Sequence, residues 1–326
     1  MNGATLRVEN LRTHFFTRQG VVKAVEDVSF SVAPGKILGL VGESGSGKSM
    51  TGYSIIGLID PPGRVIGGRI LLHGKDLRTL SPGEMRNIRG NRIAMIFQDP
   101  MMTLNPVLRV DTQMIEAIQA HAYVGRGAAL ERARDALARV GLPSPDERLL
   151  AYPHQFSGGM RQRVAIAIAL LNKPDVIIAD EPTTALDVTI QGQILFEMQK
   201  LARESGTALV WISHDLSVIA GLADEICVMY AGRIVEHGSV DQVLDAPLHP
   251  YTHGLIDSIP SRGHRGQPLR QIPGMTPALL DIPPGCAFRE RCAHADAVCS
   301  QDPALSSPVA GRQVRCFHPL TQSVTA

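Results

Sequence analysis

The sequence has few aromatic residues, no excess of either charge and no long apolar segment. Aromatic residues make up only 4% of the 326 residues, so aliphatic side chains must supply most of the core. The 32 Lys and Arg residues nearly balance the 31 Asp and Glu residues, which argues against a protein that coats nucleic acid. No apolar run reaches the roughly 18 residues of a membrane-spanning helix, and the first ten residues lack the apolar core of a signal peptide. We therefore expect a globular cytosolic protein with about two domains.

Cysteine is scarce outside the C-terminal tail, where four of the five cysteines lie: Cys286, Cys292, Cys299 and Cys316. Proteins of reducing compartments rarely need disulfide bonds, so this cluster favours a metal site over disulfide bonds. The intervening stretches of 5, 6 and 16 residues do not match a paired zinc ribbon. An iron–sulfur cluster, zinc, and free or paired thiols all remain open, with His294 and His318 as spare ligands. Cys227 lies in an apolar run and is expected to be a core residue.

Short apolar runs alternate with helix-like stretches over residues 1–245. The runs expected to be buried strands are residues 37–41, 92–97, 176–179, 208–212 and 226–230. Helices are expected at residues 112–121, 128–140, 188–204 and 216–222. This alternation predicts an α/β fold with a parallel sheet, and residues of about 100–164 form a helical insertion in it. Residues 246–326 are rich in proline, glycine and histidine and are expected to form a C-terminal extension with little regular structure.

A glycine-rich segment follows the buried run at residues 37–41 and matches the pattern Gly-x-x-x-x-Gly-Lys-Ser/Thr. Its residues are Gly42, Glu43, Ser44, Gly45, Ser46, Gly47, Lys48 and Ser49. In such a loop the backbone N–H groups surround phosphate oxygens, Lys48 reaches the β- and γ-phosphates, and the Ser49 hydroxyl ligates Mg²⁺. A glycine-rich turn without a ligand is the alternative, which the flanking strand and helix make less favourable.

A second apolar strand ends in two carboxylates, Asp180 and Glu181. At the tip of the strand Asp180 would hold the hydration shell of Mg²⁺, and Glu181 would polarise an attacking water as general base. On its own this pattern also suits a strand that ends at a solvated acidic turn. Together with the phosphate loop it favours nucleotide hydrolysis.

A third signal is the run Ser157-Gly158-Gly159 at the start of a helix that continues to about residue 171. Ser157 is a good N-cap, and exposed N–H groups at a helix start attract anions. Taken alone, the run also fits a simple capped core helix.

These three elements, in this order, resemble the ATP-binding cassette family over about residues 5–245. The resemblance implies an α/β nucleotide-binding domain with a RecA-like parallel sheet core, an antiparallel β subdomain and the helical insertion. The resemblance implies that Ser157, Gly158 and Gly159 contact the γ-phosphate held by the opposite subunit. It further implies that Gln98 senses Mg²⁺ and water, and that His214 contacts the γ-phosphate. Phe15 is expected to stack on adenine, although Phe16 is equally available. The run at residues 184–187 matches the D-loop of the family, whereas Met160 departs from the glutamine that commonly ends its Ser-Gly-Gly motif.

Within that family the sequence resembles the D-type ATPase subunit of bacterial dipeptide and oligopeptide importers. The resemblance rests on residues 156–163 and 181–189, and on a tail that contains His-Pro-Tyr-Thr at residues 249–252 and Gly-Cys-Ala-Phe at residues 285–288. It implies a peripheral ATPase at the cytoplasmic face of the cell membrane that uses ATP and Mg²⁺. The implied partners are a paired F-type ATPase or a second copy, two membrane-spanning permease subunits and an extracytoplasmic peptide-binding protein, with no nucleic acid. It also favours a 4Fe-4S cluster on the four tail cysteines.

The resemblance leaves other readings of the function open. Nickel and glutathione importers share this cassette design, so the cargo is not fixed by the sequence. A cassette ATPase acting on DNA or ribosomes would carry long coiled-coil insertions or two tandem cassettes, and the chain shows neither. A regulatory module that binds ATP without hydrolysing it is disfavoured by the presence of Glu181 and His214.

Overall fold

The computed structural model describes residues 3–184, 186–259 and 271–320. The chain divides into two compact units, each assembled from separate stretches of sequence. The first unit contains Met1–Leu6, Val32–Ile37 and Leu72–Trp211, and the second contains Arg7–Ser31, Leu38–Leu71 and Ile212–Ala326. This division differs from the domains expected at residues 1–245 and 246–326, which stay a prediction.

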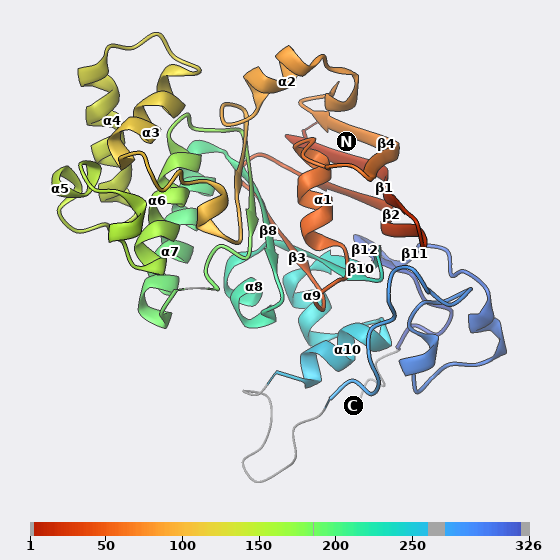
Figure 1. Cartoon of the computed structure of the whole chain (residues 1–326). Coiled ribbons are helices and arrows are strands. Elements are labelled where there is room, and N and C mark those ends of the chain that lie inside the picture. Colours follow the sequence, from red (N-terminus) through yellow and green to blue (C-terminus); the bar gives the residue numbers. More distant parts are fainter. Residues whose placement is uncertain (1–2, 185, 260–270, 321–326) are drawn as a thin grey trace. The chain divides into compact units, whose positions relative to one another are not determined.

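Helices and strands alternate along most of the described chain (Figure 1). The strands are β1 (Leu6–Thr17), β2 (Gly20–Val32), β3 (Ile37–Val41), β4 (Gly63–Leu72), β5 (Lys75–Asp76), β6 (Ile93–Ile96), β7 (Val176–Asp180), β8 (Ala208–Ser213), β9 (Glu225–Tyr230), β10 (Arg233–Ser239), β11 (Ser306–Val309) and β12 (Arg312–Val314). The helices are α1 (Lys48–Ile55), α2 (Pro82–Ile88), α3 (Val110–Gln119), α4 (Arg126–Arg139), α5 (Pro145–Leu149), α6 (Gly158–Leu170), α7 (Val188–Ser205), α8 (Leu216–Leu222), α9 (Val240–Asp245) and α10 (Pro250–Asp257). The predicted α/β fold class is confirmed.

The first unit contains a parallel pair of strands and a group of helices. Strand β6 pairs with β7 in parallel register, with Ile93 opposite Val176 and Ile96 opposite Ala179. All five residues of β7 are buried, as expected for a parallel strand covered on both faces. Helices α3 to α6 lie together (Figure 1), in and beside the stretch for which the sequence indicates a helical insertion. The buried face of α4 consists of Ala129, Ala133, Ala136 and Leu137, which recur at helical spacing.

The second unit contains strands in the order β11-β12-β10-β9-β3 and a second sheet in which β1 lies between β2 and β4. Strand β3 runs parallel to β9, whereas β10 is antiparallel to both β9 and β12. The tail was expected to have little regular structure, but it supplies β11 and β12 to this sheet. The difference arises because β12 is only three residues long and is defined by its pairing with β10.

A buried ion pair links the tail to β10. Glu236 on β10 is fully buried and accepts a hydrogen bond from the Arg312 guanidinium at 2.6 Å. Its two carboxylate oxygens also accept the N–H groups of Leu248 and His249, each at 2.8 Å. Because a buried charge is costly unless it is paired, these contacts fix where the tail meets the strand.

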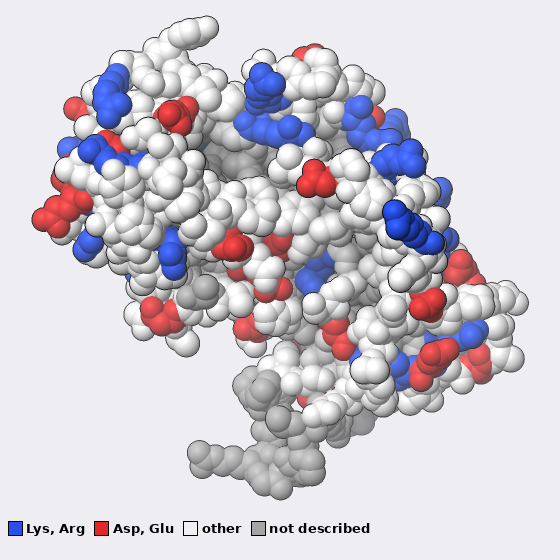
Figure 2. Space-filling view, viewed as in Figure 1, with Lys and Arg blue, Asp and Glu red and all other residues white. Residues whose placement is uncertain are grey.

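Charges of both signs are interspersed on the face shown in Figure 2, in keeping with the net charge of +1. Among the described residues, no helix combines the length and the apolar character that crossing a membrane requires.

Candidate functional site

The predicted phosphate-binding residues lie in one loop of the second unit, between β3 and α1. Lys48 is almost fully buried, and its Nζ donates hydrogen bonds to the carbonyl oxygens of Gly42 at 2.8 Å and Glu43 at 2.9 Å. The same Nζ lies 3.4 Å from the Ser46 hydroxyl. The loop thus curls around the ammonium group at the N-terminus of α1, where backbone N–H groups and the helix dipole favour an anion.

Two glycines allow the loop to lie against its neighbours. A Cβ on Gly42 would lie 2.2 Å from the carbonyl oxygen of Met229, and one on Gly47 would lie 2.3 Å from that of Ala24. Both glycines have positive φ angles, 150° and 100°, which other residues rarely adopt. The tip of the loop, at Ser44 and Gly45, is exposed.

His214 also lies in the second unit, in the link between β8 and α8. Its side chain is exposed. The next residue, Asp215, caps α8 by accepting the N–H of Ser217 at 2.8 Å, and its own N–H donates to the Ser213 hydroxyl at 3.0 Å. These contacts fix the backbone on both sides of the histidine while its ring stays accessible.

Gln98, Asp180 and Glu181 come together in the first unit because β6 and β7 are parallel neighbours with their carboxyl ends at one edge. Asp180 is buried at the end of β7. The Glu181 carboxylate accepts hydrogen bonds from the Gln98 amide at 3.4 Å and from the Thr184 hydroxyl at 3.2 Å. Glu181 has a φ of 45°, a strained value for a residue other than glycine and one that often marks a functional site.

The Ser-Gly-Gly run also lies in the first unit, at the start of α6. Ser157 caps the helix, since its hydroxyl accepts the N–H of Met160 at 3.3 Å, as predicted. Ser157 and Gly158 are exposed, whereas a Cβ on Gly159 would lie 3.2 Å from Leu186. Of the predicted D-loop at residues 184–187, residue 185 lies outside the described residues.

The two aromatic candidates for adenine stacking have different surroundings. Phe15 is half-buried, and a Cβ on Gly63 would lie 2.6 Å from its ring. Phe16 is 39% exposed, with the Arg64 guanidinium 4.6 Å from the centre of its ring. Phe16 therefore presents the more accessible face, while Phe15 packs against its own unit.

The four tail cysteines line one cavity of the second unit, together with His294 and His318. We call this cavity the cysteine pocket. Burial and the neighbouring thiols raise the pKa of Cys316 to about 11 and also raise that of Cys286. Thiols are donors that iron–sulfur clusters and zinc use, but among the described residues the donor atoms grouped within 4.8 Å of one another are those of Asp296, Cys299 and His318. Cys227 lies elsewhere, fully buried on β9, as expected for a core residue.

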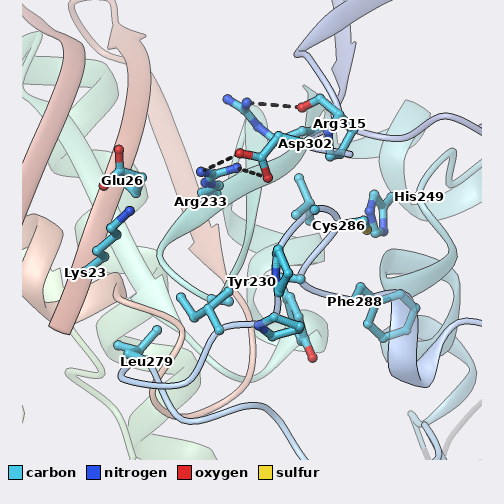
Figure 3. Close-up of a pocket in the computed structure, with 18 of the residues that line it drawn as sticks. Lys23, Glu26, Tyr230, Arg233, His249, Leu279, Cys286, Phe288, Asp302 and Arg315 are labelled. Carbon is cyan, nitrogen blue, oxygen red and sulfur yellow. Dashed lines mark hydrogen bonds and ion pairs between the residues drawn. The ribbon is translucent and has the colours of Figure 1, made fainter. Parts of the chain in front are cut away.

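A larger cavity of about 290 Å³ borders the cysteine pocket (Figure 3). Lys23 and Glu26 of β2 lie on one side of it in Figure 3, with Leu279 below them, and Cys286, Phe288 and His249 lie on the other side. Its wall shares His249, Cys286 and Phe288 with the cysteine pocket.

Sequence reasoning missed two groups of residues. One is the set of side chains that surrounds Glu43, a variable position of the phosphate-loop pattern that carries no signal of its own. The other is Asp296, whose carboxylate lies with the donor atoms of Cys299 and His318 within 4.8 Å of one another. A lone aspartate in a tail gives no spacing pattern from which this grouping could be predicted.

Comparison with known proteins finds similarity in the N-terminal and the C-terminal regions of the chain. A family model described as ABC transporter matches residues 25–184, and one described as oligopeptide/dipeptide transporter, C-terminal region, matches residues 235–299. The oligopeptide transport ATP-binding protein OppD of Escherichia coli is 46% identical over 319 residues, which cover 98% of this chain and 94% of that protein. The dipeptide transport ATP-binding protein DppD of Bacillus subtilis is 49% identical over 297 residues, 91% of this chain and 89% of that protein.

Among solved structures, an ATP-binding cassette captured as a dimer in a post-hydrolysis state, bound to ADP and Pi, has a TM-score of 0.67. It is 26% identical and covers 72% of this chain and 98% of its own. The similarity in fold and the sequence identity of 46% and 49% to the two transport proteins indicate the same family. The chain therefore belongs to the family of ATP-binding subunits of peptide-transporting ABC transporters.

Proposed function

We propose that this ATPase subunit of a peptide importer binds ATP on residues 42–49 and that a second cassette closes over the nucleotide. Lys48 would bind the β- and γ-phosphates, and the backbone N–H groups of the loop would bind the remaining phosphate oxygens. Ser49, Gln98 and Asp180 would hold the Mg²⁺ that ATP-binding cassettes require, which neutralises charge on the phosphates.

The second cassette would contribute its own Ser157, Gly158 and Gly159 to the γ-phosphate. The exposed, capped start of α6 supports this role, because its free N–H groups suit an anion. The similar structure with ADP and Pi was solved as a dimer, which also supports it. ATP then acts as the link between two cassettes, and its hydrolysis releases them.

The observation that carries the catalytic proposal is the position of Glu181, at the end of a buried strand and in contact with Gln98 and Thr184. A carboxylate held in this way is suited to accept a proton from the water that attacks the γ-phosphate. His214 would contact the γ-phosphate and stabilise the charge that develops on it. Phe15, or the more exposed Phe16, would stack on adenine.

Glu181→Gln tests the general base directly. The change keeps the size and one hydrogen-bond-accepting oxygen but replaces the carboxylate with an amide that does not accept a proton, so turnover of ATP by the assembled transporter should fall about 100-fold or more while ATP binding is retained. Glu204→Gln, at the exposed end of α7, is the matched control and should leave turnover unchanged. Turnover at the wild-type rate in Glu181→Gln would refute the assignment.

The contact with the permease subunits is proposed for the segment that follows Gln98. Met101, Met102 and Val107 are exposed there, by 38%, 65% and 75%. Exposed apolar side chains that are close in sequence suit a protein partner. We place this surface against two membrane-spanning subunits at the cytoplasmic face of the membrane, with an F-type ATPase or a second copy as the other cassette and an extracytoplasmic peptide-binding protein on the far side.

Peptides are the proposed cargo over nickel or glutathione, supported by the family model that matches the tail and by the two similar transport proteins. Uptake of labelled di- and oligopeptides by cells with and without the intact subunit tests this choice. Loss of nickel uptake alone, with peptide uptake unchanged, would reverse it.

We also propose that the cysteine pocket holds a 4Fe-4S cluster on Cys286, Cys292, Cys299 and Cys316. The position of the four cysteines around one cavity supports a metal centre. Protein purified without oxygen should contain iron and sulfide by chemical analysis, and its absorption spectrum should show a band in the visible range. Zinc alone, or no metal, would reject the cluster.

A further inference from the structure

The C-terminal extension contacts the phosphate loop through the side chain of Glu43. Two nitrogens of Arg291 donate to the two carboxylate oxygens of Glu43, at 2.7 Å and 3.0 Å. The Thr276 hydroxyl donates to the same carboxylate at 2.8 Å. These residues lie more than 230 positions apart in sequence, so the contact is created by the fold alone.

The backbone at Glu43 is held from both sides. Its N–H donates to the hydroxyl of Tyr251 on α10 at 2.8 Å. Its carbonyl oxygen, like that of Gly42, accepts from Lys48, the residue expected to bind phosphate. The extension and the phosphate-binding lysine therefore contact the same peptide unit.

Arg291 is itself fixed in place. Its side chain is only 5% exposed, and its Nε donates to the carbonyl oxygen of Pro273 at 2.9 Å. The guanidinium lies 5.8 Å from the ring centres of both Tyr230 and Phe288. Because packing already restricts the Arg291 side chain, it loses little conformational entropy when it binds Glu43. It is therefore suited to hold the Glu43 carboxylate in one position.

The pair also changes the charge of the loop. Burial disfavours the charged form of Glu43, but the hydrogen bonds from Arg291 and Thr276 outweigh burial and hold the pKa of this carboxyl below its usual value. Glu43 is therefore ionised, within the loop expected to bind a triphosphate. The Arg291 guanidinium compensates that negative charge, which would otherwise disfavour the anion.

We propose that Arg291 is a positioning residue for ATP binding. It holds Glu43, and through Glu43 the start of the phosphate loop, in the shape that receives the phosphates, which makes the C-terminal extension a working part of the nucleotide site. The inference rests on the proposed role of residues 42–49 in binding ATP.

The test compares steady-state ATP hydrolysis by assembled transporters that carry Arg291→Ala, Arg291→Lys or Thr276→Val. Loss of the ionic hydrogen bonds in Arg291→Ala should raise KM for ATP about tenfold, and the two milder changes should raise it a few-fold. The value of kcat at saturating ATP should stay within about twofold, because bound ATP restores the shape of the loop. Arg289→Ala is the matched control and should match wild type, because the Arg289 guanidinium donates to the Pro284 carbonyl oxygen at 2.9 Å and not to Glu43.

Two outcomes would overturn the inference. One is an unchanged KM in Arg291→Lys and Thr276→Val, which are mild enough to fold if Arg291→Ala does not. The other is a lower kcat with unchanged KM, which is the result expected if Arg291 only stabilises the fold. Lys48→Ala distinguishes this failure from failure of the proposed function. If Lys48→Ala loses ATP binding and the Arg291 variants do not, only the role of Arg291 is wrong.

Discussion

At the scale of single residues, Gly42 shows why the phosphate-loop pattern requires glycine. Its φ of 150° disfavours any residue with a Cβ, and that Cβ would lie 2.2 Å from the Met229 carbonyl oxygen. Backbone atoms cannot move aside as the end of a flexible side chain can. The close approach of β9 thus requires glycine at the first position of the pattern. The sequence could predict the glycine, but it could not predict that Met229 lies against it.

We predict that Gly42→Ala lowers ATP affinity by tenfold or more, because the start of the loop must move away from β9. Gly45→Ala is the matched comparison, since φ is 79° at Gly45 but nothing lies within 4 Å of the added Cβ. The ATP affinity of Gly45→Ala should fall much less than that of Gly42→Ala. Equilibrium titration of each full-length variant with a fluorescent ATP analogue measures the difference, and equal losses in the two variants would contradict the explanation.

The residues that pattern reasoning could find are those whose chemistry is local. Asp180 and Glu181 lie at the end of an apolar strand, and Lys48 belongs to a glycine-rich pattern that follows another, so their positions could be predicted. The partner of Glu43 could not, because Arg291 lies 248 residues further along and neither residue belongs to a spacing pattern. Side-chain pairs of this kind depend on the finished fold.

At the scale of elements, Asp111 in the first turn of α3 stabilises the start of the helical insertion. Its side chain is 3% exposed, and it accepts hydrogen bonds from Arg109 and from the N–H of Thr112. Burial disfavours its charge, but these hydrogen bonds outweigh burial and lower the pKa of the carboxyl. A group with a lowered pKa stabilises the fold above its usual pKa, and that stabilisation is lost as the pH falls through the lower value of the folded state.

We predict that Asp111→Asn lowers the free energy of unfolding by about 2 kcal/mol near neutral pH. The difference from wild type should stay constant above about pH 5 and shrink below about pH 4, where the aspartate of the unfolded chain becomes protonated. Denaturant unfolding at a series of pH values measures it. Asp135→Asn, which removes an exposed ion pair with Arg134, should lower the free energy of unfolding by about 0.5 kcal/mol or less. A loss in Asp111→Asn that does not vary with pH would contradict the electrostatic account.

Element boundaries were predicted well where the hydrophobic pattern is strong. Helix α8 has the predicted bounds, and α7 ends at Ser205, one residue beyond its predicted end. Helix α3 begins two residues earlier than expected, since its N-cap, Arg109, makes no side-chain capping bond that would mark the start. Strand β12 was missed because three residues of mixed character have no periodicity to detect.

At the scale of the whole molecule, the chain combines the motifs of a nucleotide site with the sequence of a peptide-transporter subunit. The family and the fold class could be predicted because the motifs occur in a fixed order and at a fixed place relative to the strands. The tail could be assigned only by resemblance, since its described residues form turns, short helices and two short strands, of which β12 pairs with β10 and β11 pairs with β12. Its Arg291 contacts Glu43 of the phosphate loop, a link that no sequence pattern indicates.

The central claim is that the Ser-Gly-Gly motif of one cassette completes the ATP site of another. The measurement that tests it most directly combines ATP hydrolysis by the assembled transporter with ATP binding by the full-length chain, both for Ser157→Arg. The account predicts that hydrolysis falls roughly tenfold or more, because a bulky cation replaces the exposed cap, while the chain's own ATP affinity is unchanged. Unchanged hydrolysis, or a loss of the chain's own ATP affinity, would contradict it.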